Sequence, residues 1–159
     1  MLLQLLESLC KIRADVAANA LDQSQFPHQP EVLGLAEAAA ARGVEPADVL
    51  KTIVVRRADD DFLFILVPGD RTISWPKLRE LLGVSRMSLP DASTALEVTG
   101  YERGTISPFG SLRAWPVIAD ERVSGREVSL GAGAHGVAAI VDADLVVAAL
   151  EATVADVTD

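Results

Sequence analysis

The feature that most constrains the fold of this chain is a β-hairpin signal near its centre. β-branched residues dominate Lys51–Arg56, three aspartates at 59–61 form a turn, and Phe62–Val67 is an unbroken apolar run. Because polar residues do not alternate with apolar ones in that run, it predicts a strand buried on both faces of its sheet. Such a strand requires neighbouring strands and packing layers on both sides.

Helical patterns surround the hairpin. Apolar residues at helical spacing over residues 2–16 predict an amphipathic helix, and the alanine-rich stretch Val32–Arg42 predicts a second that ends at Gly43. Ser74 is expected to cap a third helix that runs to Leu82. The spacing of Thr94 and Glu97 is typical of a capping box at the start of a fourth.

The C-terminal third resumes the strand pattern. Strands are predicted at 115–119 and 127–130, a last strand at 136–141, and then a helix capped by Asp142 or Asp144 that runs to Leu150. Several strands are joined by turns too short for a crossover helix. The predicted fold class is α+β, with a mixed, largely antiparallel sheet surrounded by helices in a single domain over residues 1–159.

Composition excludes several classes of protein. No apolar run approaches the roughly 18–20 residues of a membrane span, so we expect no membrane contact. The single cysteine, Cys10, excludes an internal disulfide and fits the reducing cytoplasm. The net charge is −9, but residues 51–126 carry 11 basic and 10 acidic side chains, so the acidity lies at the two ends. This distribution argues against a wide phosphate-binding surface and allows contact with one or two phosphates.

Metal and cofactor motifs are weak. Two histidines and one cysteine make a zinc site improbable, and the aspartates at 59–61 have no fourth acid at a suitable spacing. The turn from Ser129 to Gly136 departs from the GxGxxG dinucleotide pattern. We therefore expect neither a metal nor a cofactor. His135, in the same turn, is either a base or ligand or an ordinary turn histidine.

Two features remain as candidate sites. The segment Gly100–Gly110 holds three glycines and a proline, so it can present backbone N–H groups to a carbonyl or oxyanion; the alternative is an ordinary connecting loop. Lys51 stands at the head of a strand and suits a single phosphate; the alternative is a solvated surface lysine.

An ordered set of short motifs links these features. In chain order they are Leu50-Lys51-Thr52, Leu66-Val67-Pro68-Gly69-Asp70, Gly104-Thr105-Ile106-Ser107-Pro108-Phe109-Gly110, Val128-Ser129-Leu130-Gly131-Ala132-Gly133 and Asp144-Leu145. The set, which covers about residues 30–150, resembles the YbaK/ProX family. Members of this family are aminoacyl-tRNA deacylases related to the editing domain inserted in bacterial prolyl-tRNA synthetases.

The resemblance implies a trans-editing hydrolase for a mischarged aminoacyl-tRNA of the Cys- or Ala-tRNA(Pro) type. Lys51 would hold a phosphate of the terminal adenosine, and the amides of the GxxxP loop would bind the aminoacyl carbonyl, which makes Gly104, Ser107 and Pro108 catalytic-site residues. The substrate-binding set would be Thr105, Ile106, Ser129, Gly131 and His135. No protein nucleophile is implied, because the substrate's 2′-hydroxyl, a water or the amino acid's thiol would serve. The partners would be the tRNA acceptor end and an aminoacyl-tRNA synthetase.

Two departures from the family pattern leave open which amino acid is removed from the tRNA. Thr105 stands where many relatives have a second glycine, and Ala134-His135 stands where many have a basic residue. A non-catalytic module that binds a nucleotide or oligosaccharide on the same fold is the alternative function, and a structural interaction domain is a third.

Overall fold

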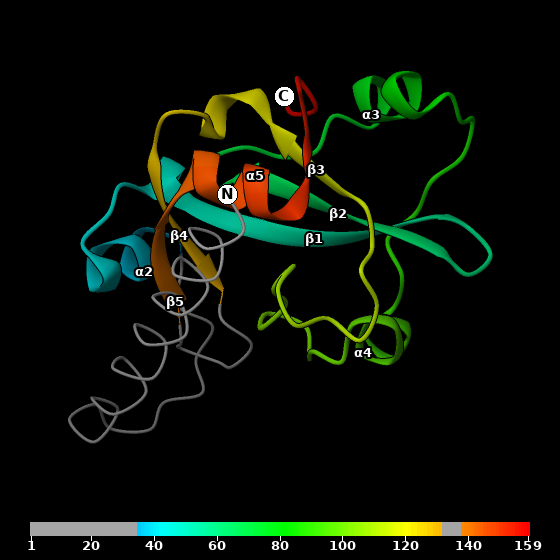
Figure 1. Cartoon of the computed structure of the whole chain (residues 1–159), viewed down its shortest axis with the longest axis horizontal. Coiled ribbons are helices and arrows are strands. Elements are labelled where there is room, and N and C mark those ends of the chain that lie inside the picture. Colours follow the sequence, from blue (N-terminus) through cyan, green and yellow to red (C-terminus); the bar gives the residue numbers. More distant parts are fainter. Residues whose placement is uncertain (1–34, 132–137) are drawn as a thin grey trace.

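A computed structural model of the chain describes residues 35–131 and 138–159 (Figure 1). The predicted N-terminal helix and His135 lie outside these ranges. The described elements, in chain order, are α2 (Leu35–Arg42), a 3-10 turn (Pro46–Asp48), β1 (Val49–Ala58), β2 (Asp61–Pro68), α3 (Trp75–Leu82), α4 (Ala92–Thr99), β3 (Val117–Asp120), a second 3-10 turn (Glu121–Val123), β4 (Glu127–Gly131), β5 (Ala138–Asp142), α5 (Ala143–Leu150) and β6 (Thr153–Ala155).

The strands form one six-stranded sheet in the order β5-β4-β1-β2-β3-β6. Its two longest pairings, β1 with β2 and β4 with β5, are antiparallel, and the first of them sets Lys51 opposite Val67. The parallel pairings of β1 with β4, β2 with β3 and β3 with β6 each cover only two or three residues. The predicted α+β class, with a mixed, largely antiparallel sheet and surrounding helices, is confirmed.

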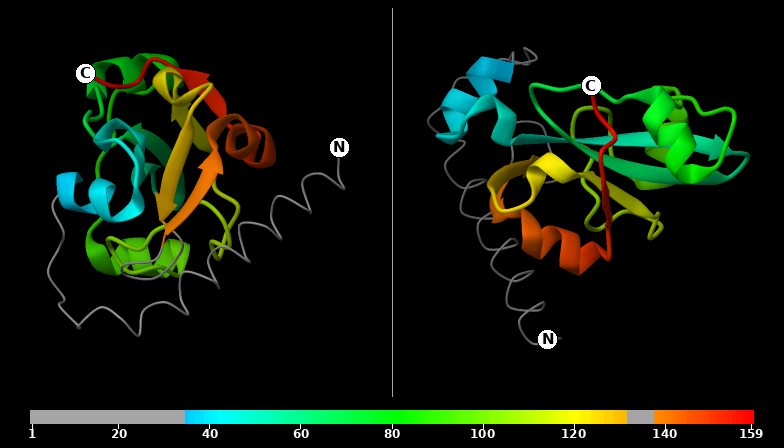
Figure 2. Two further views of the ribbon diagram at one scale, coloured as in Figure 1. Left: turned by 90° about the vertical axis from the view of Figure 1, so that its left-hand side faces the viewer. Right: turned by 90° about the horizontal axis from the view of Figure 1, so that it is seen from above.

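Strand β2 lies at the centre and is buried on both faces, as its apolar run predicts. Phe64 and Leu66 belong to a core that includes Val146 of α5. Leu63, Ile65 and Val67 belong to a second core, which includes Leu78 of α3 and Val157 of the C-terminal tail. Figure 2 shows the sheet between these layers. Each fully buried side chain of this size contributes roughly 1.5–3 kcal/mol, so the hairpin organises the whole fold.

Several predicted boundaries were wrong. β1 begins at Val49, so Lys51 is its third residue and does not stand at its head. Helix α4 is capped by Asp91, whose Oδ1 accepts a hydrogen bond of 2.7 Å from the Thr94 amide, so Thr94 lies in the first turn and does not cap it. Strand β3 begins at Val117, two residues later than predicted, because Pro116 has no N–H for a sheet ladder. Trp115 turns away instead, and its Nε1 donates to the Val98 carbonyl at 2.8 Å.

The C-terminus adds a strand that the sequence did not reveal. β6 pairs in parallel with β3, so the strand ending at Asp142 is not the last. β6 has only three residues, two of them exposed, and therefore carries no burial pattern. Asp142, one of the two predicted caps, does cap α5, which ends at Leu150 as predicted. None of the helices in the described ranges is long and apolar enough to cross a membrane.

Candidate functional site

Lys51 lies on β1 with its side chain half-buried. By strand alternation it lies on the same face as Val55, which packs in the core beneath α3. Its Nζ donates a hydrogen bond of 2.5 Å to the main-chain carbonyl of Arg71, just beyond the end of β2. Desolvation lowers the pKa of Lys51, and the nearby Asp70 carboxylate opposes that shift. The amine keeps two further N–H groups that can bind an anion.

The segment from Gly100 to Leu112 is a loop closed by its own hydrogen bonds. The Tyr101 hydroxyl donates to the Phe109 carbonyl at 2.6 Å, and the Leu112 amide donates to the Thr99 carbonyl at 3.1 Å. Thr105, Ser107 and Pro108 are buried inside this loop. Gly104 has a φ of 90°, a conformation that L side chains rarely adopt. The loop is therefore a fixed structure that requires glycine at position 104.

The hydrogen bonds of the loop determine which amides can reach a ligand. The Thr105 amide donates to the Glu102 carbonyl at 3.0 Å, as does its hydroxyl at 2.7 Å, and Pro108 has no N–H. No partner for the amides of Gly104, Ile106 and Ser107 is present among the described residues. Ile106 and Ser107 therefore have consecutive amides without a partner in the described ranges, and a pair of such donors stabilises an oxyanion when both point at it.

The loop and Lys51 approach each other at the end of β4. Leu50 pairs with Leu130 in the parallel register, and one further residue along each strand brings Lys51 level with Gly131. A Cβ on Gly131 would lie 3.2 Å from the Ile106 carbonyl oxygen, so the loop backbone rests on this glycine. The side chain of Ile106, however, packs with the core on the face of the sheet opposite Lys51. A ligand that touches both would lie across the strand ends.

The structure adds Arg42, which the sequence did not single out, to this region and shows the surroundings of Thr52 from the first motif. Arg42, in the last turn of α2, donates to the fully buried Ser129 hydroxyl at 3.2 Å, and burial lowers the pKa of its guanidinium. The Thr52 hydroxyl, next to Lys51, is buried with no hydrogen-bond partner in the described part of the chain. No local pattern marks Arg42, because Ser129 lies 87 residues away.

The Leu66–Asp70 motif has a structural explanation. Gly69 is buried where the end of β2 passes the start of β1, and a Cβ there would collide with the carbonyl oxygens of Pro46 and Val49. Only glycine allows this approach of two backbones. The motif therefore places the 69–71 turn, including the carbonyl that holds Lys51.

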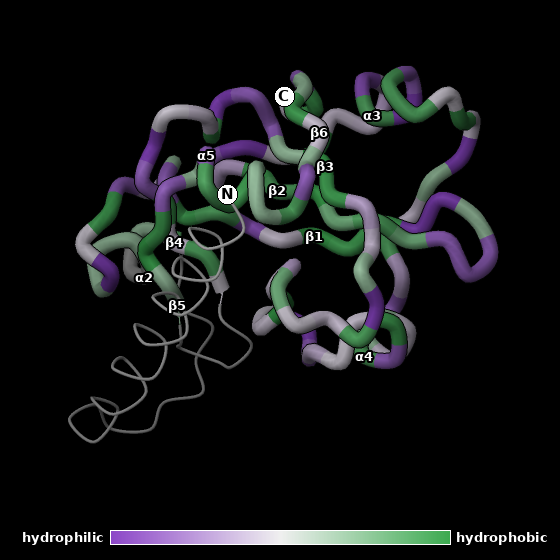
Figure 3. Tube along the Cα trace, viewed as in Figure 1, coloured by the Kyte–Doolittle hydropathy of each residue, from purple (hydrophilic) through white to green (hydrophobic). Residues whose placement is uncertain are grey.

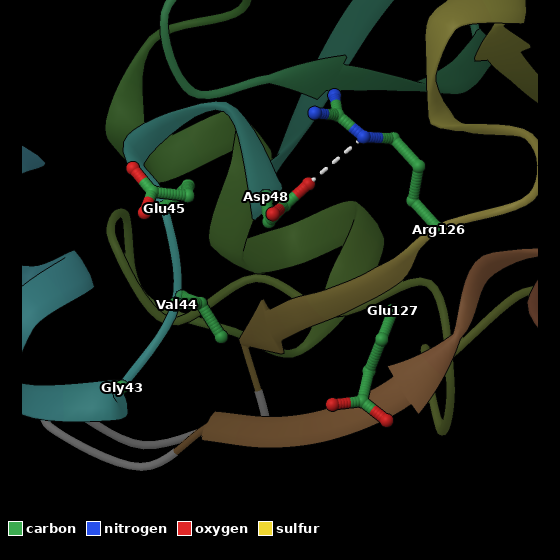
Figure 4. A pocket seen from close by; sticks show the side chains of 6 residues that line it. All are labelled: Gly43, Val44, Glu45, Asp48, Arg126 and Glu127. Atoms are coloured by element: carbon green, nitrogen blue, oxygen red, sulfur yellow. Dashed lines mark ion pairs between the residues drawn. The ribbon is translucent and has the colours of Figure 1, made fainter.

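A cleft of about 480 Å³ lies between the start of β1 and the start of β4. Figure 4 shows the side chains that line it. Asp48 pairs there with Arg126 at 3.1 Å, and Glu45 and Glu127 add two more carboxylates. This lining is net negative and repels phosphate. No group of three or more possible metal-ligating side chains occurs in the described ranges.

Sequence comparison gives the family. The sequence profile of the aminoacyl-tRNA editing domain matches residues 29–148. The proline–tRNA ligase of Bacillus licheniformis is 31% identical over 100 residues, which are 63% of this chain and 17% of that enzyme. The ligase of Desulforamulus reducens is 38% identical over 87 residues, 55% of this chain and 15% of that enzyme. The chain thus matches less than a fifth of the length of these relatives.

Two solved structures have the same fold. The hypothetical protein APE2540 has a TM-score of 0.74 at 28% identity, with 85% of this chain and 87% of that chain covered. A protein described as a candidate trans-editing enzyme for prolyl tRNA synthetase has a TM-score of 0.76 at 24% identity, with 92% and 96% covered. The profile match confirms the resemblance noted from the motifs. The chain belongs to the YbaK-like aminoacyl-tRNA editing domain family, the activity of which is aminoacyl-tRNA deacylation.

Proposed function

We propose that this chain is a trans-editing hydrolase that removes a wrongly attached amino acid from a tRNA of the Cys- or Ala-tRNA(Pro) type. The observation that carries the proposal is the pair of free amides at Ile106 and Ser107, on a loop that rests on Gly131 beside Lys51. The similarity to parts of proline–tRNA ligases supports a tRNA for proline as the substrate. A synthetase is the natural partner for such a domain.

The loop would stabilise the transition state of ester hydrolysis. A water attacks the carbonyl carbon of the aminoacyl ester, and negative charge develops on the carbonyl oxygen. Donors at Ile106 and Ser107 stabilise this charge, and one such donor typically contributes about 3 kcal/mol. The C–O bond to the ribose then breaks, the ribose oxygen takes a proton, and the free amino acid leaves.

Lys51 would position the substrate. Its two remaining N–H groups suit a phosphate of the terminal adenosine, and its hydrogen bond to Arg71 holds the amine in place. The adjacent 2′-hydroxyl of the substrate or a bound water then transfers the proton to the leaving ribose oxygen. No side chain of the protein acts as a nucleophile. Catalysis is by positioning and by backbone dipoles.

The test is single-turnover deacylation of a panel of charged tRNAs: Cys-tRNA(Pro), Ala-tRNA(Pro) and the correct Pro-tRNA(Pro). We expect hydrolysis of a mischarged member and little of the correct one. Lys51→Ala should abolish that activity. Arg126→Ala is the matched control, because Arg126 is exposed and pairs with Asp48 at 3.1 Å, away from the C-terminal tail. Tight binding of an adenosine nucleotide with no hydrolysis of any panel member would indicate the non-catalytic module instead.

A further inference from the structure

A second cleft, of about 540 Å³, lies at the tip of the β1–β2 hairpin. Four arginines and two serines line it with a single carboxylate, that of Asp59: the lining residues are Arg56, Arg57, Ala58, Asp59, Arg79, Ser85, Arg86, Met87 and Ser88. Four arginines in one cleft are unexpected in a chain whose net charge is −9. The cleft therefore concentrates positive charge where the rest of the chain is acidic.

The cleft is built from three separate segments that are fixed to one another. The Arg56 amide donates to the Ser88 carbonyl at 2.8 Å, and the Ser88 amide returns a hydrogen bond to the Arg56 carbonyl at 3.1 Å. Met87 packs against the core beneath α3. Figures 1 and 2 show the segment after α3 running beside the end of the hairpin. The arginines therefore share one preformed surface.

Two of the four arginines are free to bind an anion. Arg56 pairs with Asp59 at 2.6 Å, and Arg57 pairs with Asp61 at 2.8 Å. Arg79 and Arg86 have no acidic partner among the residues that the structure describes. In Figure 3 hydrophilic colour is prominent at the hairpin tip, and the segment after α3 mixes hydrophobic and hydrophilic residues. An arginine presents a planar set of N–H donors that matches phosphate oxygens.

The distance between Lys51 and the arginine cleft indicates which part of a tRNA the cleft could contact. Arg56 lies five residues beyond Lys51 on the same strand, which corresponds to roughly 17 Å at about 3.3 Å per residue. At about 3.4 Å per nucleotide of a stacked strand, this equals roughly five nucleotides. The four unpaired nucleotides at the 3′ end of a tRNA would then bring the first paired phosphates of the acceptor stem to the cleft.

We propose that this arginine cleft binds the phosphate backbone of the tRNA acceptor stem while the terminal adenosine occupies the site at Lys51. The proposal rests on the function proposed above. The arginine cleft would give the tRNA a second, local contact on a protein whose overall charge repels RNA. Arg79 and Arg86 supply the binding, and the ion pairs of Arg56 and Arg57 fix the surface around them.

The test compares two substrates of different length. The double variant Arg79→Gln/Arg86→Gln should lower kcat/KM on a full-length mischarged tRNA by roughly tenfold, mainly through KM, because two charge-assisted contacts are lost. It should hydrolyse a short aminoacylated oligonucleotide that ends in CCA like the unsubstituted protein. The salt dependence of tRNA binding should also become shallower by roughly one to two in log–log slope. Arg126→Gln is the matched control and should change neither value, because Arg126 is exposed, precedes β4 and pairs with Asp48 outside the arginine cleft.

The proposal would be overturned if the double variant lost kcat/KM equally on the full-length tRNA and on the short oligonucleotide, or lost none on the full-length tRNA. The cleft would then bind another anionic partner, such as an acidic protein surface. The single variant Arg86→Gln, at an exposed position, gives the same test with little risk to folding. If the unsubstituted protein hydrolyses neither substrate, the proposed function fails. In that case, the salt dependence of uncharged tRNA binding, measured on the same variants, still tests whether the arginine cleft binds tRNA.

Discussion

The amine of Lys51 and the main-chain carbonyl of Arg71, twenty residues apart in sequence, are joined by a hydrogen bond of 2.5 Å. Arg71 is held in turn, because its Nε donates to the Thr158 hydroxyl at 2.7 Å. That hydroxyl donates to the carboxylate of the fully buried Asp120 at 2.9 Å. The position of the candidate catalytic lysine thus depends on the docking of the C-terminal tail.

Lys51→Ala should remove deacylation without unfolding the protein. Burial lowers the pKa of this lysine, so folding disfavours its charged form. We expect a rate loss of a hundredfold or more, corresponding to about 3 kcal/mol of transition-state stabilisation, with a melting temperature close to that of the unsubstituted protein. Lys51→Arg should rescue poorly, because a planar guanidinium does not occupy the position of an ammonium. Unchanged single-turnover rates in Lys51→Ala would remove this residue from the site.

Gly104→Ala should reduce turnover more than stability. With φ at 90°, an alanine costs roughly 1–2 kcal/mol and shifts the loop backbone that carries the Ile106 and Ser107 amides. Gly125→Ala is the matched control: its φ is 72° and a Cβ would meet no atom within 4 Å. Both variants should lose similar stability in urea titrations, and only Gly104→Ala should lose activity. An active Gly104→Ala protein would mean that the loop only connects α4 to β3.

Gly69→Ala should destabilise the protein strongly. The added methyl group would lie 2.8 Å from the Val49 carbonyl oxygen and would also overlap that of Pro46, and backbone atoms have little room to move. Overpacking of this kind typically costs about 1–3 kcal/mol. Gly125→Ala, in open space at a φ of 72°, carries the backbone strain of a positive φ but no overpacking, and it should have the higher urea midpoint of the two. Equal urea midpoints for the two variants would contradict the close packing at Gly69.

Asp120→Asn should change how stability depends on pH. Burial alone would raise the pKa of Asp120, but hydrogen bonds from Arg122, Val157 and Thr158 outweigh it and lower the pKa below its usual value. The stabilisation is therefore present above the unfolded pKa of about 3.9 and is lost as the pH falls through the lower folded value.

For Asp120→Asn we expect a loss of about 2 kcal/mol at pH 7, from weakened hydrogen bonds to a buried group. This loss should shrink as the pH falls below about 4. Melting temperatures measured from pH 7 to pH 2 on both proteins test this. A constant difference across that range would show that the charge of Asp120 does not stabilise the fold.

The sequence determined the parts of this protein that depend on local pattern. The apolar run of β2 predicted burial on both faces, and Gly43 marked a helix end that the structure places in positive φ. The ordered motifs identified the family, because their residues serve chemistry and backbone packing that tolerate few substitutions. These signals are readable since each one lies within a few consecutive residues.

Only the tertiary structure decided the relationships between distant segments. It brings Arg42 to Ser129, Asp120 to Thr158, and Ser88 to the edge of β1 beside four arginines. It also shows that the loop side chain of Ile106 and the amine of Lys51 belong to opposite faces of the sheet. None of these contacts has a periodic signature, because strand order and tail docking come from burial and hydrogen bonding summed over the whole chain.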